Sequence, residues 1–194
     1  MTVSHDFSSL THLVWSADRI AEGIELLAHV SGLVSRPFKG SQSSIPPPPS
    51  AESSRFDRWL QSIASHLGVE AEPVVSSYSE MKTFLRDAGP AVLQLPASED
   101  TIEPQFLLVL RGGPRRLTVL TPQMTRRTIP IGVVQQALSS ALEEPYNEQV
   151  EHMLTHIQVG KRQRERVRST LLEGWLASRR IAAGWLLRLA PSAS

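Results

Sequence analysis

The sequence contains no cysteine among its 194 residues. This absence excludes a disulfide framework, a thiolate zinc site and any thiol nucleophile. Long apolar runs are missing as well, because no stretch approaches the roughly 20 consecutive apolar residues that span a bilayer. The first residues lack the basic start and apolar core of a secretory signal. We therefore expect a soluble, cytoplasmic chain.

An excess of charge of either sign is also lacking. The 20 lysines and arginines nearly balance the 19 aspartates and glutamates, which leaves a net charge of +1. Such a balance provides no overall attraction to nucleic acid or to a membrane. The apolar share of 41% and the charged share of 20% are typical of a soluble globular chain. The length suits one domain with appended segments.

No cofactor or metal is expected. His152 and His156 are four residues apart and could share one helix face, but Met153 follows the first histidine where a zinc-protease helix has glutamate. A solvated helix face explains the two histidines better. The turn Arg111-Gly112-Gly113-Pro114 lacks the lysine of a phosphate-binding loop, so its glycines are assigned to a tight hairpin turn.

The N-terminal half predicts helices on both sides of a proline-rich loop. Apolar residues recur at helical spacing over residues 18–30, where Gly32 follows as a stop, and again over residues 56–67. Residues 33–54 include four consecutive prolines, which exclude a helix or a central strand. We interpret them as a surface loop inside the domain.

The middle of the chain predicts strands. Short apolar runs occur at residues 69–75, 91–95, 105–111 and 117–120, and Gly112-Gly113-Pro114 turns the last two into a hairpin. Ser77 and Glu80 are spaced as a capping box that opens a helix before Gly89. Helical spacing returns after Ile129. Helices, then hairpin strands, then helices predict an α+β fold in which an antiparallel sheet packs on helices.

The C-terminal part, residues 146–194, is predicted to be a helical connector attached to a domain at residues 1–145. Tyr146 to Val159 has helical spacing, and residues 161–189 are expected to form an amphipathic helix. This last segment begins with a basic run and continues into leucines and two tryptophans; a membrane surface, a protein partner or plain solvent could face Lys161, Arg162, Arg164, Arg168, Trp175 and Trp185. The absence of interleaved aromatic residues argues against nucleic acid.

One segment resembles a known family. Residues 89–123 read GPAVLQLPASEDTIEPQFLLVLRGGPRRLTVLTPQ. This order of strand, loop and hairpin is similar to the papain-like, bacteriocin-processing peptidase domains that precede peptide-exporting ABC transporters. The resemblance extends over roughly residues 17–142 and implies a papain-like cysteine-peptidase fold with further amphipathic helices at its C-terminus.

At the three catalytic positions of that family, this sequence has other residues. The first turn of the matching helix reads Ser16-Ala17-Asp18-Arg19, Gln105 occupies the place of the histidine, and Thr121-Pro122 replaces the Asp-Pro pair. A glutamine cannot accept a proton near neutral pH, and a threonine cannot orient an imidazolium by charge. The resemblance therefore implies an inactive peptidase-like domain, not an enzyme.

Inactive members of the family are thought to hold or recruit the substrate polypeptide, because a papain-like cleft without its nucleophile can still accept an extended peptide. The expected partners are then a peptide or protein substrate and the membrane and nucleotide-binding domains of a transporter, in cis or in trans, at the cytosolic face of the inner membrane. The residues expected to contact the peptide are Ser16, Arg19, Gln94, Gln105, Phe106 and Thr121.

Two other functions stay open. A soluble scaffold or accessory interaction protein of a peptide biosynthetic cluster would use the C-terminal helices to dimerise or to dock an enzyme. A residual hydrolase without a thiol is the third hypothesis, although Ser16 lacks the G-x-S-x-G context of a serine hydrolase.

Overall fold

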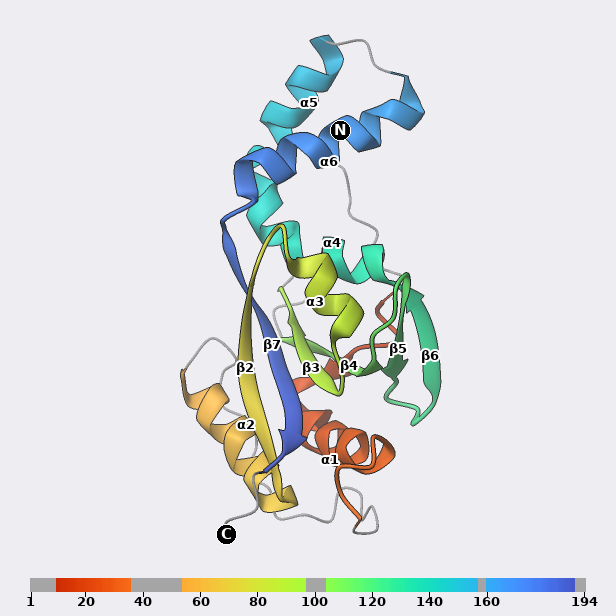
Figure 1. Cartoon of the computed structure of the whole chain (residues 1–194), viewed down its shortest axis with the longest axis vertical. Coiled ribbons are helices and arrows are strands. Elements are labelled where there is room, and N and C mark those ends of the chain that lie inside the picture. Colours follow the sequence, from red (N-terminus) through yellow and green to blue (C-terminus); the bar gives the residue numbers. More distant parts are fainter. Residues whose placement is uncertain (1–9, 36–53, 97–103, 157–159, 191–194) are drawn as a thin grey trace.

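The computed structural model describes residues 10–35, 54–96, 104–156 and 160–190. Along these segments strands and helices alternate irregularly, and the whole chain is drawn in Figure 1. The elements are β1 (Trp15–Ser16), the 3₁₀ turn η2 (Ala17–Arg19), α1 (Ile20–Val30), α2 (Ser54–Leu67), β2 (Val69–Ser77), α3 (Met81–Asp87), β3 (Ala91–Leu95), β4 (Gln105–Arg111), β5 (Arg116–Leu120), β6 (Arg126–Pro130), α4 (Ile131–Glu143), the 3₁₀ turn η3 (Glu144–Tyr146), α5 (Asn147–His156), α6 (Lys161–Leu176) and β7 (Arg180–Leu189).

The strands form one seven-stranded sheet in the order β2-β7-β3-β4-β5-β6, and the short β1 pairs beside β4. Every pairing is antiparallel. The prediction of an α+β fold is therefore confirmed. The predicted strands at 69–75, 91–95, 105–111 and 117–120 correspond to β2, β3, β4 and β5.

Two helices cover one face of the sheet, which we call the α1–α2 face. Helix α1 places an apolar residue against the sheet at every third or fourth position, as the periodicity predicts. This core cluster joins the sheet to both helices; Trp15, Ile24, Leu27, Phe56, Leu60, Val92, Phe106, Leu108 and Trp185 belong to it. The indole N–H of Trp15 in β1 donates to the Leu120 carbonyl at 2.8 Å, which ties the segment that precedes α1 to the end of β5.

Helix α1 ends at Val30, and Gly32 follows it as the predicted stop. This glycine has a φ of +77°, in the left-handed region that side chains disfavour. Its N–H donates to the His29 carbonyl, and the N–H of Leu33 donates to Ala28. These two bonds form a Schellman motif, so the last helical carbonyls are satisfied.

Helices α3 and α4 cover the opposite face, the α3–α4 face. Met81, Leu85, Leu93, Leu107, Val109, Val134 and Leu138 are fully or almost fully buried there. The same cluster continues into α5 and α6 through Val150, Leu154, Leu172 and Leu176. Strands β3 and β4 are buried on both sides, which explains why their sequences are nearly all apolar instead of alternating. Figure 1 shows α5 and α6 standing beyond α4, away from the sheet.

The predicted helix over residues 161–189 is wrong in its second half. Helix α6 ends at Leu176, and residues 180–189 form β7, which lies between β2 and β3 in the sheet. Residues 180–189 therefore belong to the sheet domain and are not part of a helical connector. Hydrophobic spacing misleads here because a strand buried among other strands has a continuous apolar sequence.

The capping box is wrong, because α3 begins at Met81 after Glu80 without a side-chain cap, and the Ser77 hydroxyl donates to the Glu80 carboxylate instead. Strands β1 and β6 were not predicted. Most of the proline-rich loop, residues 36–53, lies outside the described residues.

Candidate functional site

The sheet splits where β3 and β7 separate. The two strands pair only from Ala91–Leu186 to Leu93–Gly184, whereas β7 stays paired with β2 down to Arg180. A bulge between Val74 and Val75 accompanies the separation. The edges of β3 and β7 that face each other beyond this point have no strand partner among the described residues.

Gly184 is the last residue of β7 that pairs with β3 before the two strands separate. Its φ is +142°, and a Cβ at this position would lie 2.0 Å from the Val92 carbonyl oxygen. Only glycine combines this backbone conformation with so close an approach to a neighbouring strand. The bend of β7 away from β3 at this point therefore depends on Gly184 being a glycine.

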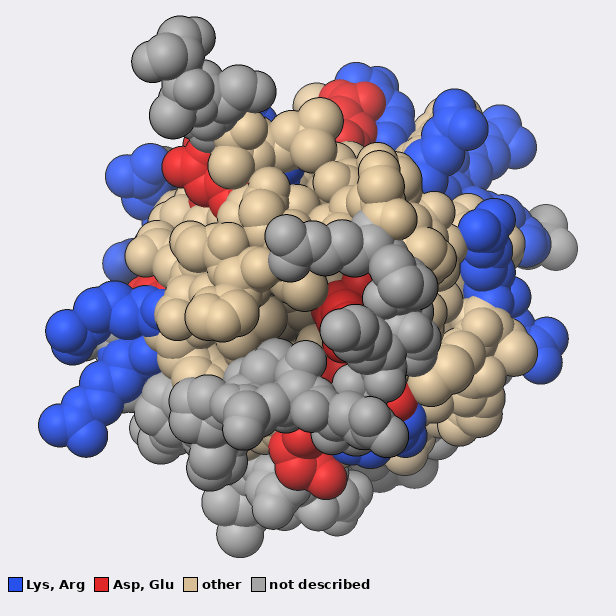
Figure 2. Space-filling model, turned by 90° about the horizontal axis from the view of Figure 1, so that it is seen from below, with Lys and Arg blue, Asp and Glu red and all other residues tan. Residues whose placement is uncertain are grey.

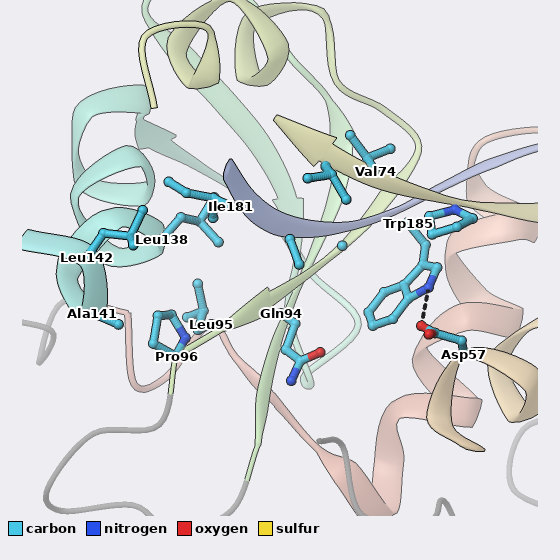
Figure 3. A pocket seen from close by; sticks show the side chains of 14 residues that line it. Asp57, Val74, Gln94, Leu95, Pro96, Leu138, Ala141, Leu142, Ile181 and Trp185 are labelled. Atoms are coloured by element: carbon cyan, nitrogen blue, oxygen red, sulfur yellow. Dashed lines mark hydrogen bonds between the residues drawn. The ribbon is translucent and has the colours of Figure 1, made fainter. Parts of the chain in front are cut away.

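A cavity of about 550 Å³ lies in the split, and we call it the slot. Its size falls within the range of roughly 300–1,000 Å³ that is usual for ligand pockets. Figure 3 shows helix α4 on one side, the end of β3 below and β7 with β2 above. Its walls are mostly apolar; the side chains of Val74, Leu95, Pro96, Leu138, Leu142, Ile181 and Trp185 line them.

Two polar side chains break this apolar lining. Asp57 projects from α2, and its Oδ1 accepts a hydrogen bond from the indole N–H of Trp185 at 3.1 Å. Gln94 extends from β3 into the slot, and its amide has no hydrogen-bond partner among the described residues. Asp57 is the only ionisable residue among those described along the slot. The slot thus offers one carboxylate and one free amide within an apolar surface.

An aromatic cluster fixes the Asp57 side of the slot. The rings of Phe56 and Phe106 stack with centroids 5.1 Å apart, and Trp59 and Trp185 pack on Phe56 at 5.2 Å and 5.4 Å. Aromatic pairs at these separations are stabilising. Trp185 is therefore packed against Phe56, and its hydrogen bond keeps the carboxylate of Asp57 at the wall of the slot.

Three predicted peptide-binding residues lie together in a second cavity, the N-terminal groove, of about 310 Å³. Ser16, Arg19 and Gln105 line it, and Ser16 pairs with Gln105 between β1 and β4. Arg19 is held in place by the Glu22 carboxylate at 3.0 Å and by the Pro122 carbonyl at 3.2 Å. The first turn of the α1 segment and the start of β4 are thus adjacent.

The other three lie elsewhere. Phe106 is fully buried in the aromatic cluster, and Thr121 is 1% exposed with its hydroxyl hydrogen-bonded to that of Thr125 at 2.8 Å. Neither side chain reaches the N-terminal groove. Gln94 lies in the slot. The six residues therefore do not form one continuous surface.

The C-terminal candidates are divided as well. Trp185 is 5% exposed in β7, so it does not share a helix face with Trp175, which is half-buried on α6 and packs on Tyr146. Arg164 forms an ion pair with Glu151, and Arg168 is buried. Lys161 and Arg162 begin α6, and their side chains lie outside the described atoms. Among the described residues no helix combines the length and the apolar character needed to cross a bilayer.

Arg168, in the middle of α6, belongs to a buried polar network. It lies 3.7 Å from Glu143 on α4 and donates to Asn147 on α5 at 2.6 Å. Glu143 also accepts hydrogen bonds from Tyr78 at 2.9 Å and from Ser139 at 2.6 Å. The network joins α6 to the end of β2, so the helical pair α5–α6 is anchored to the sheet domain.

Burial, and then the neighbouring Glu143 carboxylate, raise the pKa of the Tyr78 hydroxyl above its usual value of 10.0. The folded chain binds this proton more tightly than the unfolded chain does. The interaction therefore stabilises the folded chain fully below pH 10, and this stabilisation is lost as the pH rises above that value. We expect Tyr78→Phe to flatten the decline of stability above pH 10 and to cost about 1 kcal/mol at neutral pH. Urea unfolding from pH 7 to pH 11 measures both effects; an unchanged alkaline slope would contradict them.

The slot residues Asp57, Leu142 and Ile181 were not predicted. They come from α2, α4 and β7, and their proximity depends on the position of β7 in the sheet. One signal was available, because a glycine inside an apolar run often marks a bulge, and Gly184 is such a glycine.

Among the described residues no group of three histidines, aspartates or glutamates is placed to hold a metal ion. Comparisons of the chain with models of known families, with curated proteins and with solved structures found no match.

Proposed function

We propose that this domain binds an extended polypeptide segment in the slot and does not cleave it. The observation that carries the proposal is a pair of strand edges, on β3 and β7, that have no strand partner among the described residues and flank an apolar cavity. An extended chain can add to such an edge through main-chain hydrogen bonds, while pockets select its alternate side chains. The slot provides both components.

The lining favours particular peptides. Leu138, Leu142 and Ile181 would receive an apolar side chain, and the Gln94 amide would pair with the peptide main chain. Among the described lining residues only Asp57 is ionisable, so an acidic side chain at that end would be repelled, whereas an amide or a cation would be accepted. The expected ligand is an extended apolar segment with a neutral or basic residue at one end.

The N-terminal groove supports binding without cleavage. The resemblance equates Ser16 with the nucleophile segment and Gln105 with the base, and the two residues are paired across β1 and β4. A glutamine at this place cannot activate a hydroxyl by taking its proton. Thr121 is tied to Thr125 instead of pointing toward Gln105. A papain-like ancestry of the fold is compatible with this arrangement and is part of the proposal.

On this proposal the bound polypeptide is cargo, and the domain recruits it for export by an ABC transporter at the cytosolic face of the inner membrane. The export role rests on the resemblance of residues 89–123. A second role, as a scaffold or accessory interaction protein, is favoured by one observation. Helices α5 and α6 extend beyond the sheet, where they offer a separate contact surface (Figure 1).

Random peptides of about twelve residues, displayed on phage and selected on the full chain, provide the ligands for a test; the selected sequences are then made synthetically. We expect Ala141→Arg combined with Gln94→Ala to weaken their binding by at least about tenfold in fluorescence titrations, because a long side chain fills the slot while the amide is lost. Both positions reach the solvent side of the slot, so the fold should tolerate the changes.

Ser16→Ala combined with Gln105→Ala is the matched control in the N-terminal groove, and it should leave the affinity within about twofold. Loss of binding in this control and not in the slot variant would place the peptide in the N-terminal groove. Equal binding by both variants and the parent chain would contradict peptide recognition at either cavity.

A further inference from the structure

Charge is distributed unevenly along a chain whose net charge is only +1. Between residues 104 and 142 the sequence contains five arginines and no aspartate or glutamate. The five are Arg111, Arg115, Arg116, Arg126 and Arg127, and all are exposed. None forms an ion pair or a side-chain hydrogen bond with another described residue, in contrast to Arg19, Arg86, Arg164, Arg168 and Arg188.

Strand register brings three of them to one side of the sheet. A register shift between Val109 and Arg111 interrupts the alternation of sides along β4, so Arg111 lies opposite Thr118. Thr118 lies opposite Thr128, and the three residues form one row across β4, β5 and β6. Arg116 and Arg126 point to the same side, because side chains two residues apart along a strand share a face. We call this surface, made by Arg111, Arg116, Thr118, Arg126 and Thr128, the arginine face.

The arginine face is the uncovered part of the α1–α2 face. Helix α1 packs on β4, whereas Arg116, Arg126 and Thr128 on the outer strands are exposed. In Figure 2 blue side chains project along the right-hand side of the molecule, the side on which β5 and β6 lie in Figure 1. With strands roughly 4.8 Å apart, the guanidinium groups span about 10–15 Å.

We propose that the arginine face and the adjoining outer edge of β6 bind an acidic polypeptide segment that adds to the sheet as a strand. The three basic residues of the arginine face are all arginines, whose planar guanidinium groups bind carboxylates through two parallel hydrogen bonds. Strand β6 ends the sheet, so one side of its main chain has no partner among the described residues. An acidic peptide matches both features, since it supplies carboxylates and a main chain.

Other anionic partners match only one feature. A lipid surface or a nucleic-acid duplex offers phosphates but no main chain to pair with β6. A single-stranded nucleic acid would require aromatic side chains for base stacking, and the arginine face has none. This second binding surface is also distinct from the slot, which lies at the β3–β7 split and carries a carboxylate instead of cations.

The test uses the full chain and a fluorescent peptide of about ten residues that alternates glutamate with threonine. We expect the triple variant Arg111→Gln, Arg116→Gln, Arg126→Gln to bind it at least about tenfold more weakly than the parent chain. The control triple variant Arg166→Gln, Arg179→Gln, Arg180→Gln removes the same charge from exposed residues elsewhere and should stay within about twofold. Equal weakening by both triples would overturn the proposal.

Strand addition is tested on the peptide, with no change to the protein. Two versions are N-methylated at alternate amides, one at the odd and one at the even positions. Only one set of amides can face β6, so one version should lose binding and the other should keep it. Equal binding of both would show that charge alone attracts the peptide, and would overturn strand addition.

Phosphatidylserine vesicles and a DNA duplex are titrated in parallel. Tighter binding of either than of the peptide, lost in the arginine-face triple and not in the control triple, would assign the surface to an anionic lipid or to nucleic acid instead. The slot variant Ala141→Arg with Gln94→Ala should bind the acidic peptide as tightly as the parent chain does. This result would show that the arginine face binds independently of the slot, so that either proposal can fail without the other.

Discussion

Replacing Gly184 by alanine is expected to lower the free energy of unfolding by about 4 kcal/mol, the sum of backbone strain and overpacking. The new Cβ would lie 2.0 Å from the Val92 carbonyl oxygen and 2.8 Å from the Cα of Leu93. Both contacts are with backbone, which cannot rotate away as a side chain could. Strand β7 would have to move away from β3, and the pairing that holds the two halves of the sheet together would weaken.

Urea or thermal unfolding measures the effect. For a chain of this length a loss of this size lowers Tm by roughly 8–16 °C. Gly174→Ala is the matched control, since this exposed glycine lies in α6 with nothing within 4 Å of an added Cβ. It should stabilise the chain by about 0.5–1 kcal/mol. A Gly184→Ala variant as stable as the parent would show that β7 does not bend as described.

Replacing Phe106 by alanine should destabilise the fold by about 4 kcal/mol, because it empties a fully buried ring position. The ring stacks on Phe56, which also contacts Trp59 and Trp185. The loss would therefore loosen the wall of the slot at Asp57. Phe106 was expected to contact peptide directly, and its burial implies instead that its substitution acts through stability.

Gln105→Ala is the control for Phe106→Ala. The two residues are neighbours on β4, but Gln105 is half-buried and points to the N-terminal groove, so its substitution should cost less than about 1 kcal/mol. Urea unfolding measures the loss of stability in each variant, and an m value equal to that of the parent chain shows that the two losses can be compared. Peptide titration should be done well below the unfolding midpoint of Phe106→Ala. A stable Phe106→Ala variant with weakened binding would restore the direct role.

The sequence predicts the centre of this fold better than its borders. Helix α1 has apolar residues at helical spacing, strand β4 is a short apolar run that ends at the turn Gly112-Gly113-Pro114, and Gly32 predicts the end of α1. Strand β6 has a single buried residue, Ile129, because it lies at the edge of the sheet, and one apolar position carries no periodicity. Strand β7 fails for the opposite reason, since its run of apolar residues suits a helix equally well.

The candidate sites also differ in how far the sequence predicts them. The resemblance predicts that Ser16 and Gln105 both contact a peptide in one cleft, and in the structure the two residues are paired between β1 and β4. The slot could not be predicted, because Asp57, Leu142 and Ile181 meet only after β7 is inserted between β2 and β3. A net charge of only +1 gives no sign of the arginine face. The face can be derived from the register of β5 with β6 once those strands are known.

The central position of β7 also governs the order in which the chain can fold during its synthesis. Within the described part of the chain, strand β2 pairs with β7 alone. The α2–β2 unit can therefore join strands β3–β6 only after residues 180–189, more than a hundred positions later, have been made. Such a distant pairing is slow, because a long loop must close before any contact rewards it. Until β7 emerges, the facing edges of β2 and β3 are both open, and this period is when the nascent chain depends most on protection from aggregation.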